Sequence, residues 1–217
     1  MSARRRYLGL ALIGALGTQT ACVTSRIDTS FNSNVELTDS ASVVLLARRQ
    51  NVEHETESGF MDCVKKAITS GSEALPLGSD TEFMDQLFPW FEPRIAPLSD
   101  ENLPELLAKP GVAERVLESG IRYVIWVDGS TELIDGGGQL SCDINIGCFG
   151  FNWWEKGANY EAAIWDLHDA KSMGLVSTDV SGRSYMPAVV VPIPLIARTQ
   201  AAACKGMADS LRGYLNQ

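Results

Sequence analysis

The sequence has only two histidines, His54 and His168. It has no Cys-x-x-Cys pair of the kind that binds zinc and no G-x-S-x-G motif of a serine hydrolase. It also has no glycine-rich loop directly before a helix, which a phosphate site would need. It is also poor in basic residues, with 18 Lys and Arg against 27 Asp and Glu. Nucleic-acid binders carry a basic patch, so this balance argues against a nucleic-acid partner. We therefore expect no cofactor and no resident metal.

The amino-terminal segment has the three zones of a bacterial export signal. Arg4, Arg5 and Arg6 precede the apolar run "YLGLALIGALG", and small and polar residues follow up to Cys22. This order is typical of a secretory signal peptide. The apolar run is shorter than the roughly 20 residues that a membrane-spanning helix needs. We predict that residues 1–21 are removed.

The residues at the predicted cleavage site resemble the lipobox of bacterial lipoproteins. Thr20, Ala21 and Cys22 match that pattern, while Gln19 stands where the family usually has an apolar residue. The resemblance implies that Cys22 becomes the acylated terminus, with palmitate among its chains. Val23 is not the Asp that retains enteric lipoproteins in the inner membrane, so the implied location is the outer membrane, facing the periplasm. Ordinary cleavage to a soluble periplasmic protein is the alternative.

The segment after Cys22 is polar. Residues 22–41 are rich in Ser, Thr and Asn and predict a flexible tether. Residues 42–217 then form a single domain of ordinary size. Removal of residues 1–21 takes three arginines and no acids, which changes the net charge from −9 to −12.

Five cysteines are an odd number for an exported protein, and acylation of Cys22 leaves four. Cys142 and Cys148 lie six residues apart and favour a local disulfide, since exported proteins can form them. Cys63 and Cys204 lie on the apolar faces of two expected helices. They either pair with each other or remain buried as small apolar residues.

The order of the expected elements predicts an α/β fold. "SVVLLAR" (42–48) and "IRYVIWVDG" (121–129) are buried strands, because nearly every position is apolar. Helices are expected around residues 56–71, 80–88, 103–120 and 199–215, with one or two helices in the third segment and with Ser79 and Asn102 as caps. A hairpin follows residue 160. The segments 136–159 and 186–197 are expected as a glycine-containing excursion and an edge or covering segment.

The hairpin "AAIWDLHDAKSMGLVSTDVSG" contains Asp166 and Gly174. With the element order over residues 42–217, it resembles the domain of penicillin-binding-protein activator lipoproteins, curli-secretion lipoproteins and the amino-terminal part of TolB. The resemblance implies one mixed-direction sheet with flanking helices. Curli-type pores also need long alternating membrane hairpins, which the sequence does not reveal, so no pore is predicted.

Aromatic residues gather in "CFGFNWWEKGANY" (148–160), beside the possible disulfide loop, and in "LFPWFEP". Aromatics are favoured at interfaces, although the end of a sheet also buries them as ordinary core. The sequence therefore indicates a partner-binding face with the candidates Phe149, Phe151, Trp153, Trp154 and Trp90.

Three functions remain open on these residues. The first is a non-catalytic, lipid-anchored protein that presents an interaction domain to an envelope protein in assembly or secretion. The second is a small periplasmic hydrolase that uses Asp128 or His168, which requires a cleft that gathers an acid, a base and a nucleophile. The third is a ligand carrier with a closed apolar pocket lined by Phe149, Phe151 and Trp153.

Overall fold

The computed structural model describes residues 22–32, 35, 42–48, 56–92, 95–97 and 99–216. The predicted signal peptide, His54 and most of the second half of the expected tether lie outside these residues. No helix in the described part of the chain is long and apolar enough to cross a membrane.

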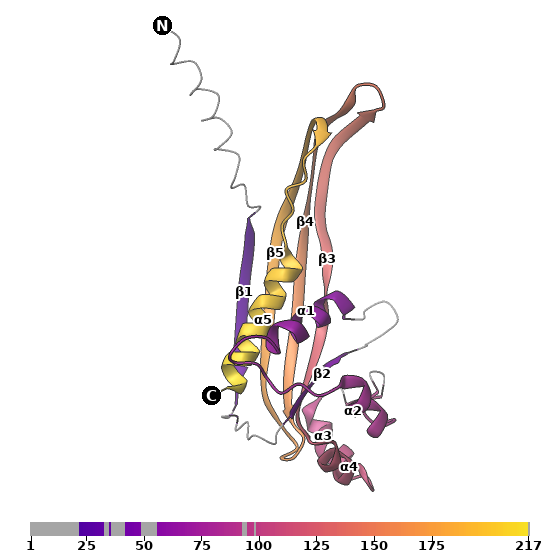
Figure 1. Ribbon diagram of the computed structural model, residues 1–217, viewed down its shortest axis with the longest axis vertical. Coiled ribbons are helices and arrows are strands. Elements are labelled where there is room, and N and C mark those ends of the chain that lie inside the picture. Colours follow the sequence, from indigo (N-terminus) through magenta and orange to yellow (C-terminus); the bar gives the residue numbers. More distant parts are fainter. Residues whose placement is uncertain are drawn as a thin grey trace. The chain divides into compact units, whose positions relative to one another are not determined.

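One five-stranded sheet organises the chain, in the order β1-β5-β4-β3-β2 (Figure 1). Its strands are β1 (Val23–Phe31), β2 (Ser42–Ala47), β3 (Ile121–Asp143), β4 (Gly147–Asp166) and β5 (Lys171–Pro192). The strand β2 runs parallel to β3, with Val44 opposite Val124. Short turns join β3 to β4 and β4 to β5, as in antiparallel hairpins. The mixed sheet with flanking helices predicted from the sequence is confirmed.

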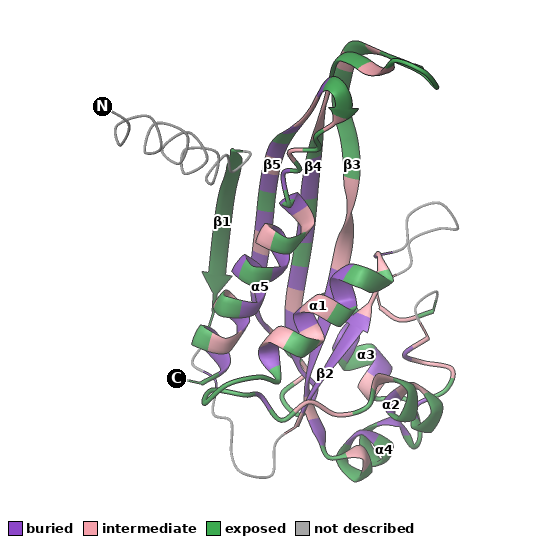
Figure 2. Cartoon of the chain, turned by 45° about the horizontal axis from the view of Figure 1, so that its top comes forward, coloured by how far each residue is buried: buried purple, intermediate pink, exposed green. Residues whose placement is uncertain are grey.

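Helices pack on both faces of this sheet. On one face lie α1 (Ser58–Ile68) and α5 (Thr199–Leu215), where Phe60, Val64, Met207 and Leu211 are fully buried (Figures 1 and 2). A second apolar core joins the sheet to α2 (Asp80–Gln86), α3 (Leu103–Leu107) and α4 (Val112–Ser119). The 3-10 turn η1 (Asp100–Asn102) precedes α3.

The expected helix caps have different outcomes. The Ser79 hydroxyl accepts the backbone N–H of Glu82 at 3.2 Å, so the cap predicted for α2 is confirmed. The cap predicted at Asn102 is wrong. Asn102 has helical backbone angles at the end of η1, and its side chain makes no capping hydrogen bond.

The chain divides into two compact units. The core unit contains the described residues within 24–132, 157–181 and 199–216, and it holds both helical layers. The hairpin unit contains, among the described residues, 22–23, 133–156 and 182–198. The strands β3, β4 and β5 are continuous through both units. The domain boundaries expected from the sequence stay a prediction.

The segment 23–31 is strand β1, where a flexible tether was expected. This segment forms a strand because a few apolar side chains, spaced by an even number of residues, face the same helix. The polar composition of the segment hides this pattern. Phe31 stacks on Tyr214 of α5 with ring centroids 3.8 Å apart, and Ile27 lies against Gly206 of the same helix. Arg26 and Asp28, on either side of Ile27 in the sequence, form an exposed ion pair. Period-2 alternation, and not mean polarity, therefore decides this segment.

The expected excursion over residues 136–159 is also corrected, because β3 and β4 continue through it as strands of 23 and 20 residues. The sequence therefore contains a long hairpin that its pattern did not reveal. Asp128 and Gly129 form a dipeptide that is typical of turns, yet they lie inside β3 as well. Gly129 has φ +133°, and a Cβ there would collide with the backbone of Asn159 on β4. The glycine serves a close approach of two strands.

The outer part of β5 covers residues expected as an edge or covering segment. The strand β5 runs to Pro192 and includes Pro187. The chain then folds back beside it, since Tyr185 and Leu195 exchange both backbone hydrogen bonds, at 2.9 and 2.7 Å. Prolines in this strand are compatible with an edge position.

Candidate interaction surface

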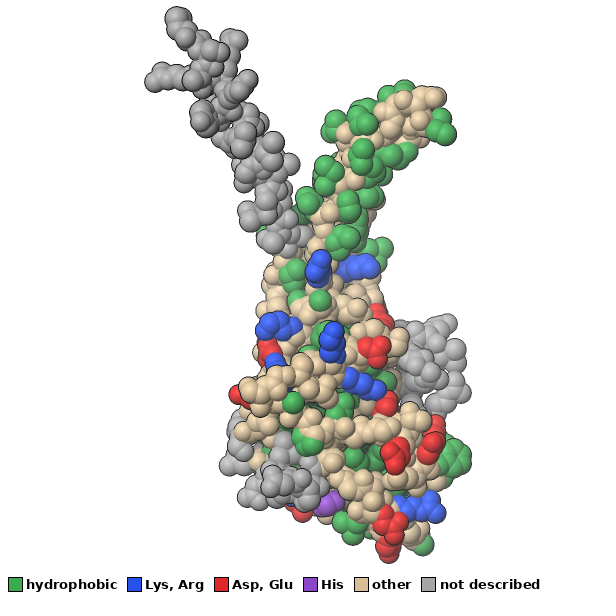
Figure 3. Space-filling model, in the orientation of Figure 1, with side chains coloured by type: hydrophobic (Ala, Val, Ile, Leu, Met, Phe, Trp, Pro, Cys, Tyr) green, Lys and Arg blue, Asp and Glu red, His purple; other side chains and the backbone are tan. Residues whose placement is uncertain are grey.

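Exposed apolar side chains are concentrated on the hairpin unit. Figure 3 shows hydrophobic side chains over most of this unit, on the face drawn. Ile144 is 99% exposed and Val189 is 79% exposed. The large apolar side chains of this unit that are exposed to a third or more of their surface are Val23, Leu133, Ile134, Ile144, Ile146, Phe149, Phe151, Val189, Val190, Val191, Ile193 and Ile196. A contiguous exposed apolar surface marks a binding site for a partner or a membrane.

Both faces of this unit are apolar. Neighbouring residues of a strand point to opposite faces. Leu133 and Ile134 of β3 are consecutive and both exposed, so they place apolar side chains on opposite faces. On β5, Val189, Val190 and Val191 are also exposed, and Val190 has φ +76°, which interrupts the regular alternation there. The apolar surface therefore wraps around the strands instead of forming one flat patch.

A disulfide closes the turn between β3 and β4. Cys142 and Cys148 are bonded with their Cα atoms 4.0 Å apart. Within the loop, the Asp143 carboxylate accepts the backbone N–H of Asn145 at 2.8 Å. The local pairing that the sequence favoured is present, and it holds the two strand ends together beside the exposed Ile144 and Ile146.

The aromatic candidates of the hairpin unit form an ordered row. Trp153 lies under the guanidinium of Arg183, at 4.6 Å from the ring centroid. Glu155 accepts two hydrogen bonds from Arg183, at 2.7 and 3.1 Å. Phe151 lies beside Tyr185, with ring centroids 6.0 Å apart. The hydrogen bonds of Glu155 raise the pKa of Arg183. In this row, aromatic side chains lie beside the Arg183 guanidinium, which Glu155 holds in place.

The other partner-binding candidates lie as follows. Trp154, next to Trp153, is half-buried, and Phe149 is 44% exposed. Trp90 belongs to the core unit, where the Arg115 guanidinium lies 5.3 Å from its ring centroid. A common binding face for these residues stays a prediction.

The residues considered for a hydrolase do not assemble a catalytic group. Asp128 borders two cavities of about 390 and 310 Å³, and the described residues that line them include no histidine. His168 is exposed in the turn after β4. Its backbone N–H donates to Asp166 at 2.9 Å. The described residues contain no cluster of three or more His, Cys, Asp or Glu side chains placed to hold a metal ion. For a ligand carrier, Phe149 and Phe151 are too exposed to line a closed pocket.

Asp166 instead organises the β4–β5 turn. Its carboxylate is fully buried, and one oxygen accepts two hydrogen bonds from Arg122, both at 3.0 Å. The other oxygen accepts the backbone N–H groups of His168 and Asp169. The bond to Asp166 raises the pKa of Arg122. Gly174 has a packing role too, since a Cβ there would lie 2.6 Å from the Ser30 oxygen of β1.

A partly buried cluster of polar side chains joins the N-cap of α1 and the first turn of α5 to the sheet. The Tyr160 hydroxyl donates to Glu57 and lies 2.8 Å from the Thr131 hydroxyl. Gln200 donates to Glu57 at 2.9 Å. Burial, followed by the bond to Glu57, raises the pKa of Tyr160 to about 12.

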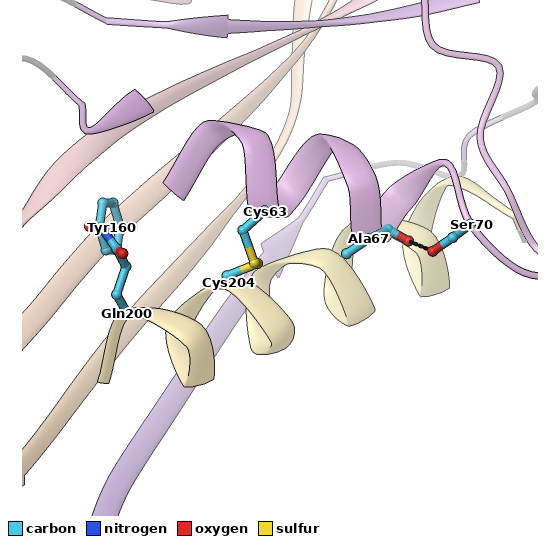
Figure 4. Close-up of a disulfide and its surroundings, with 6 residues drawn as sticks. All are labelled: Cys63, Ala67, Ser70, Tyr160, Gln200 and Cys204. Carbon is cyan, nitrogen blue, oxygen red and sulfur yellow. Dashed lines mark hydrogen bonds between the residues drawn. A yellow bond between two sulfur atoms is a disulfide. The ribbon is translucent and has the colours of Figure 1, made fainter. Parts of the chain in front are cut away.

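The pair Cys63 and Cys204 forms a disulfide between α1 and α5, close to Tyr160 and Gln200 (Figure 4). Their Cα atoms are 6.2 Å apart, and 141 residues separate them in the chain. Both disulfides that the sequence allowed are therefore present. Cys22 is exposed and unbonded among the described cysteines.

Comparison with known proteins gives a structural likeness only. No protein-family model matches the sequence, and no curated protein matches it significantly. Solved structures that it resembles include PelC dodecamers from Paraburkholderia phytofirmans. One, a variant, is 9% identical with a TM-score of 0.44, and covers 89% of this chain and 100% of its own. The other is 11% identical with a TM-score of 0.42, and covers 88% and 98%. Neither likeness bears on the function of this chain.

The sequence contained the signal for part of this surface. The parts of β3, β4 and β5 in the hairpin unit carry few charges, since Asp143 is the only charged residue between Gly136 and Trp154, and residues 184–197 have none. Local sequence alone predicts an excursion and an edge or covering segment there. The exposure of Val189 to Val191, and the role of Arg183 beside Trp153, emerge only when the strands are placed together.

Proposed function

We propose that this protein is a non-catalytic, lipid-anchored protein of the outer membrane that faces the periplasm and presents its hairpin unit to a protein of an envelope assembly or secretion system. The anchor is the acylated Cys22. The observation that carries the proposal is the row of Trp153, Arg183 and Tyr185 on the hairpin unit.

The composition of this row favours a protein partner. Trp, Tyr and Arg are the side chains that most often dominate binding energy at protein interfaces. Here Glu155 fixes the guanidinium over Trp153, so little side-chain freedom remains to be lost on binding. The net charge of −12 expected for the chain without residues 1–21 favours a partner surface that is basic around its edges.

The test is crosslinked affinity capture from outer membranes with the acylated protein. Trp153→Ala and Trp154→Ala together should abolish capture of a specific protein and leave the melting temperature nearly unchanged. Phe88→Ala is the matched control, because Phe88 is 61% exposed on the core unit, and it should leave capture intact. Equal capture by parent and double variant, or a large loss of stability in the double variant, contradicts the proposal.

Intact-mass measurement of the purified protein tests the anchor separately. We expect a chain that begins at Cys22 and carries the mass of its acyl chains. A mass without that increment would favour a soluble periplasmic protein over an anchored one. The capture experiment tests the binding surface in either case.

A further inference from the structure

We propose that the outer end of the hairpin unit, namely residues 140–151 and 187–193, inserts into the interfacial layer of a lipid bilayer. This inference deepens the proposed function, on which it rests for the presence of a membrane beside the protein. It assigns lipid acyl chains, and not a protein, to the part of the hairpin unit beyond the Trp153–Arg183 row.

The distribution of apolar side chains favours lipid over a protein partner. A protein that docks on a strand pair covers one face and leaves the other to water, which calls for polar residues there. The three consecutive residues Val189, Val190 and Val191 of β5 are all exposed, and the consecutive Leu133 and Ile134 expose apolar side chains on both faces of β3. Exposed Ile144 and Ile146 extend this surface around the turn. An apolar medium on all sides satisfies such a surface, whereas a single docked protein does not.

The distribution of charged residues also favours lipid over a protein partner. Across the outer end the only charge is Asp143, and the charges return at Glu155 and Arg183. Trp153 lies between these two zones, in contact with Arg183. Tryptophan and arginine with apolar surface on one side and water on the other are typical of the boundary between acyl chains and headgroups.

The backbone limits the depth of insertion. Among the described residues, β2 pairs with β3 only as far as Val127, so the outer edge of β3 has no partner strand there. Unpaired backbone groups are very unfavourable in the centre of a bilayer but are hydrated in its interfacial layer. We therefore place the outer end at the level of the headgroups and the first part of the acyl chains.

The experiment uses the chain with Cys22→Ser, which carries no acyl group, and vesicles of phosphatidylcholine and phosphatidylethanolamine. We expect the protein to float with these vesicles, with little effect of salt, because apolar burial and not charge drives the binding. Ile144→Asp and Val189→Asp together should weaken vesicle binding by about tenfold or more. Leu117→Asp with Phe88→Asp is the matched control, since these residues are 62% and 61% exposed on the core unit. The control should bind like the parent.

Quenching of tryptophan fluorescence by brominated lipids reports the location. We expect quenching that is stronger for bromine near the headgroup end of the acyl chain than near its methyl end. Trp153→Phe with Trp154→Phe should remove most of it, because Trp90, Trp126 and Trp165 lie in the core unit.

Three results overturn the inference. They are a parent chain that does not float, an equal loss of binding in the control variant, and an oligomer in solution that dissociates in Ile144→Asp with Val189→Asp. The last result assigns the surface to a second copy of the chain. None of them alters protein capture through Trp153, so the inference and the proposed function fail separately.

Discussion

Cys63 of α1 is bonded to Cys204 of α5, and this bond closes a loop across 141 residues that contains most of the sheet. The two helices lie side by side on the same face, where Cys204 is 1% exposed. The bond therefore ties the first helix of the core unit to its last helix.

Replacing both residues by alanine should lower the free energy of unfolding by about 4–5 kcal/mol, according to the chain-entropy account of long loops. Chemical denaturation followed by circular dichroism measures this loss. The pair Cys142→Ser and Cys148→Ser is the control, since that loop spans only six residues of the hairpin unit. A similar, small change in both variants contradicts the assignment.

Asp166→Asn should destabilise the core unit by about 3 kcal/mol, because the buried carboxylate is the hydrogen-bonded partner of Arg122. Asp169→Asn is the matched control. Its side chain is 49% exposed and pairs with Lys171, so the substitution should change stability much less than Asp166→Asn does. Urea midpoints of the two variants measure the difference, and equal midpoints refute the role given to Asp166.

Tyr160 should make stability fall between about pH 10 and pH 12. Its pKa is raised to about 12 in the fold, while an unfolded tyrosine loses its proton near 10. The folded chain therefore retains the proton that the unfolded chain loses, so its stabilisation is complete below pH 10 and is lost as the pH rises. Two pH units correspond to about 2–3 kcal/mol.

Urea unfolding of the parent and of Tyr160→Phe at a series of pH values isolates this contribution from other tyrosines and lysines. The difference between the two should shrink above pH 10. A constant difference across that range contradicts the shifted pKa.

Gly129→Ala should destabilise the sheet by at least about 2 kcal/mol, because φ is +133° and the added Cβ meets the backbone of Asn159. Gly59→Ala is the opposite case. Gly59 lies in α1 with no atom within 4 Å of its added Cβ, so alanine should stabilise by about 0.5–1 kcal/mol. Thermal unfolding gives both signs, and a neutral Gly129→Ala would contradict the close approach of Gly129 to Asn159.

Much of the core unit follows from local sequence. The continuous apolar runs of β2 and the start of β3 predict strands buried on both faces, and Phe60 to Ile68 predict the covered face of α1. The hairpin around Asp166 is similarly predictable, since Val176 and Val180 alternate with Ser177 and Asp179.

The hairpin unit is harder to predict because its local signals conflict. Gly136 to Gly138 and Pro187 to Pro194 are usual in loops and turns, yet they lie in or beside long strands. Alternation says which side chains share a face, but not whether another element covers that face. The exposure of Val189 is a property of the assembled chain, and β1 was missed because its apolar residues are few and spaced by polar ones.

The start of β1 at Val23 has a consequence for an anchored protein. If Cys22 carries the lipid, a single peptide bond separates the acylated residue from the edge of the sheet. A linker of this length keeps the first residue of the sheet within about 4 Å of the acylated residue. Twenty flexible residues would allow a distance several times greater. A short linker raises the effective concentration of the protein at the bilayer and restricts the orientations that the protein samples. Anchoring would then do more than localise the chain, because it would also determine which surface of the protein faces the membrane.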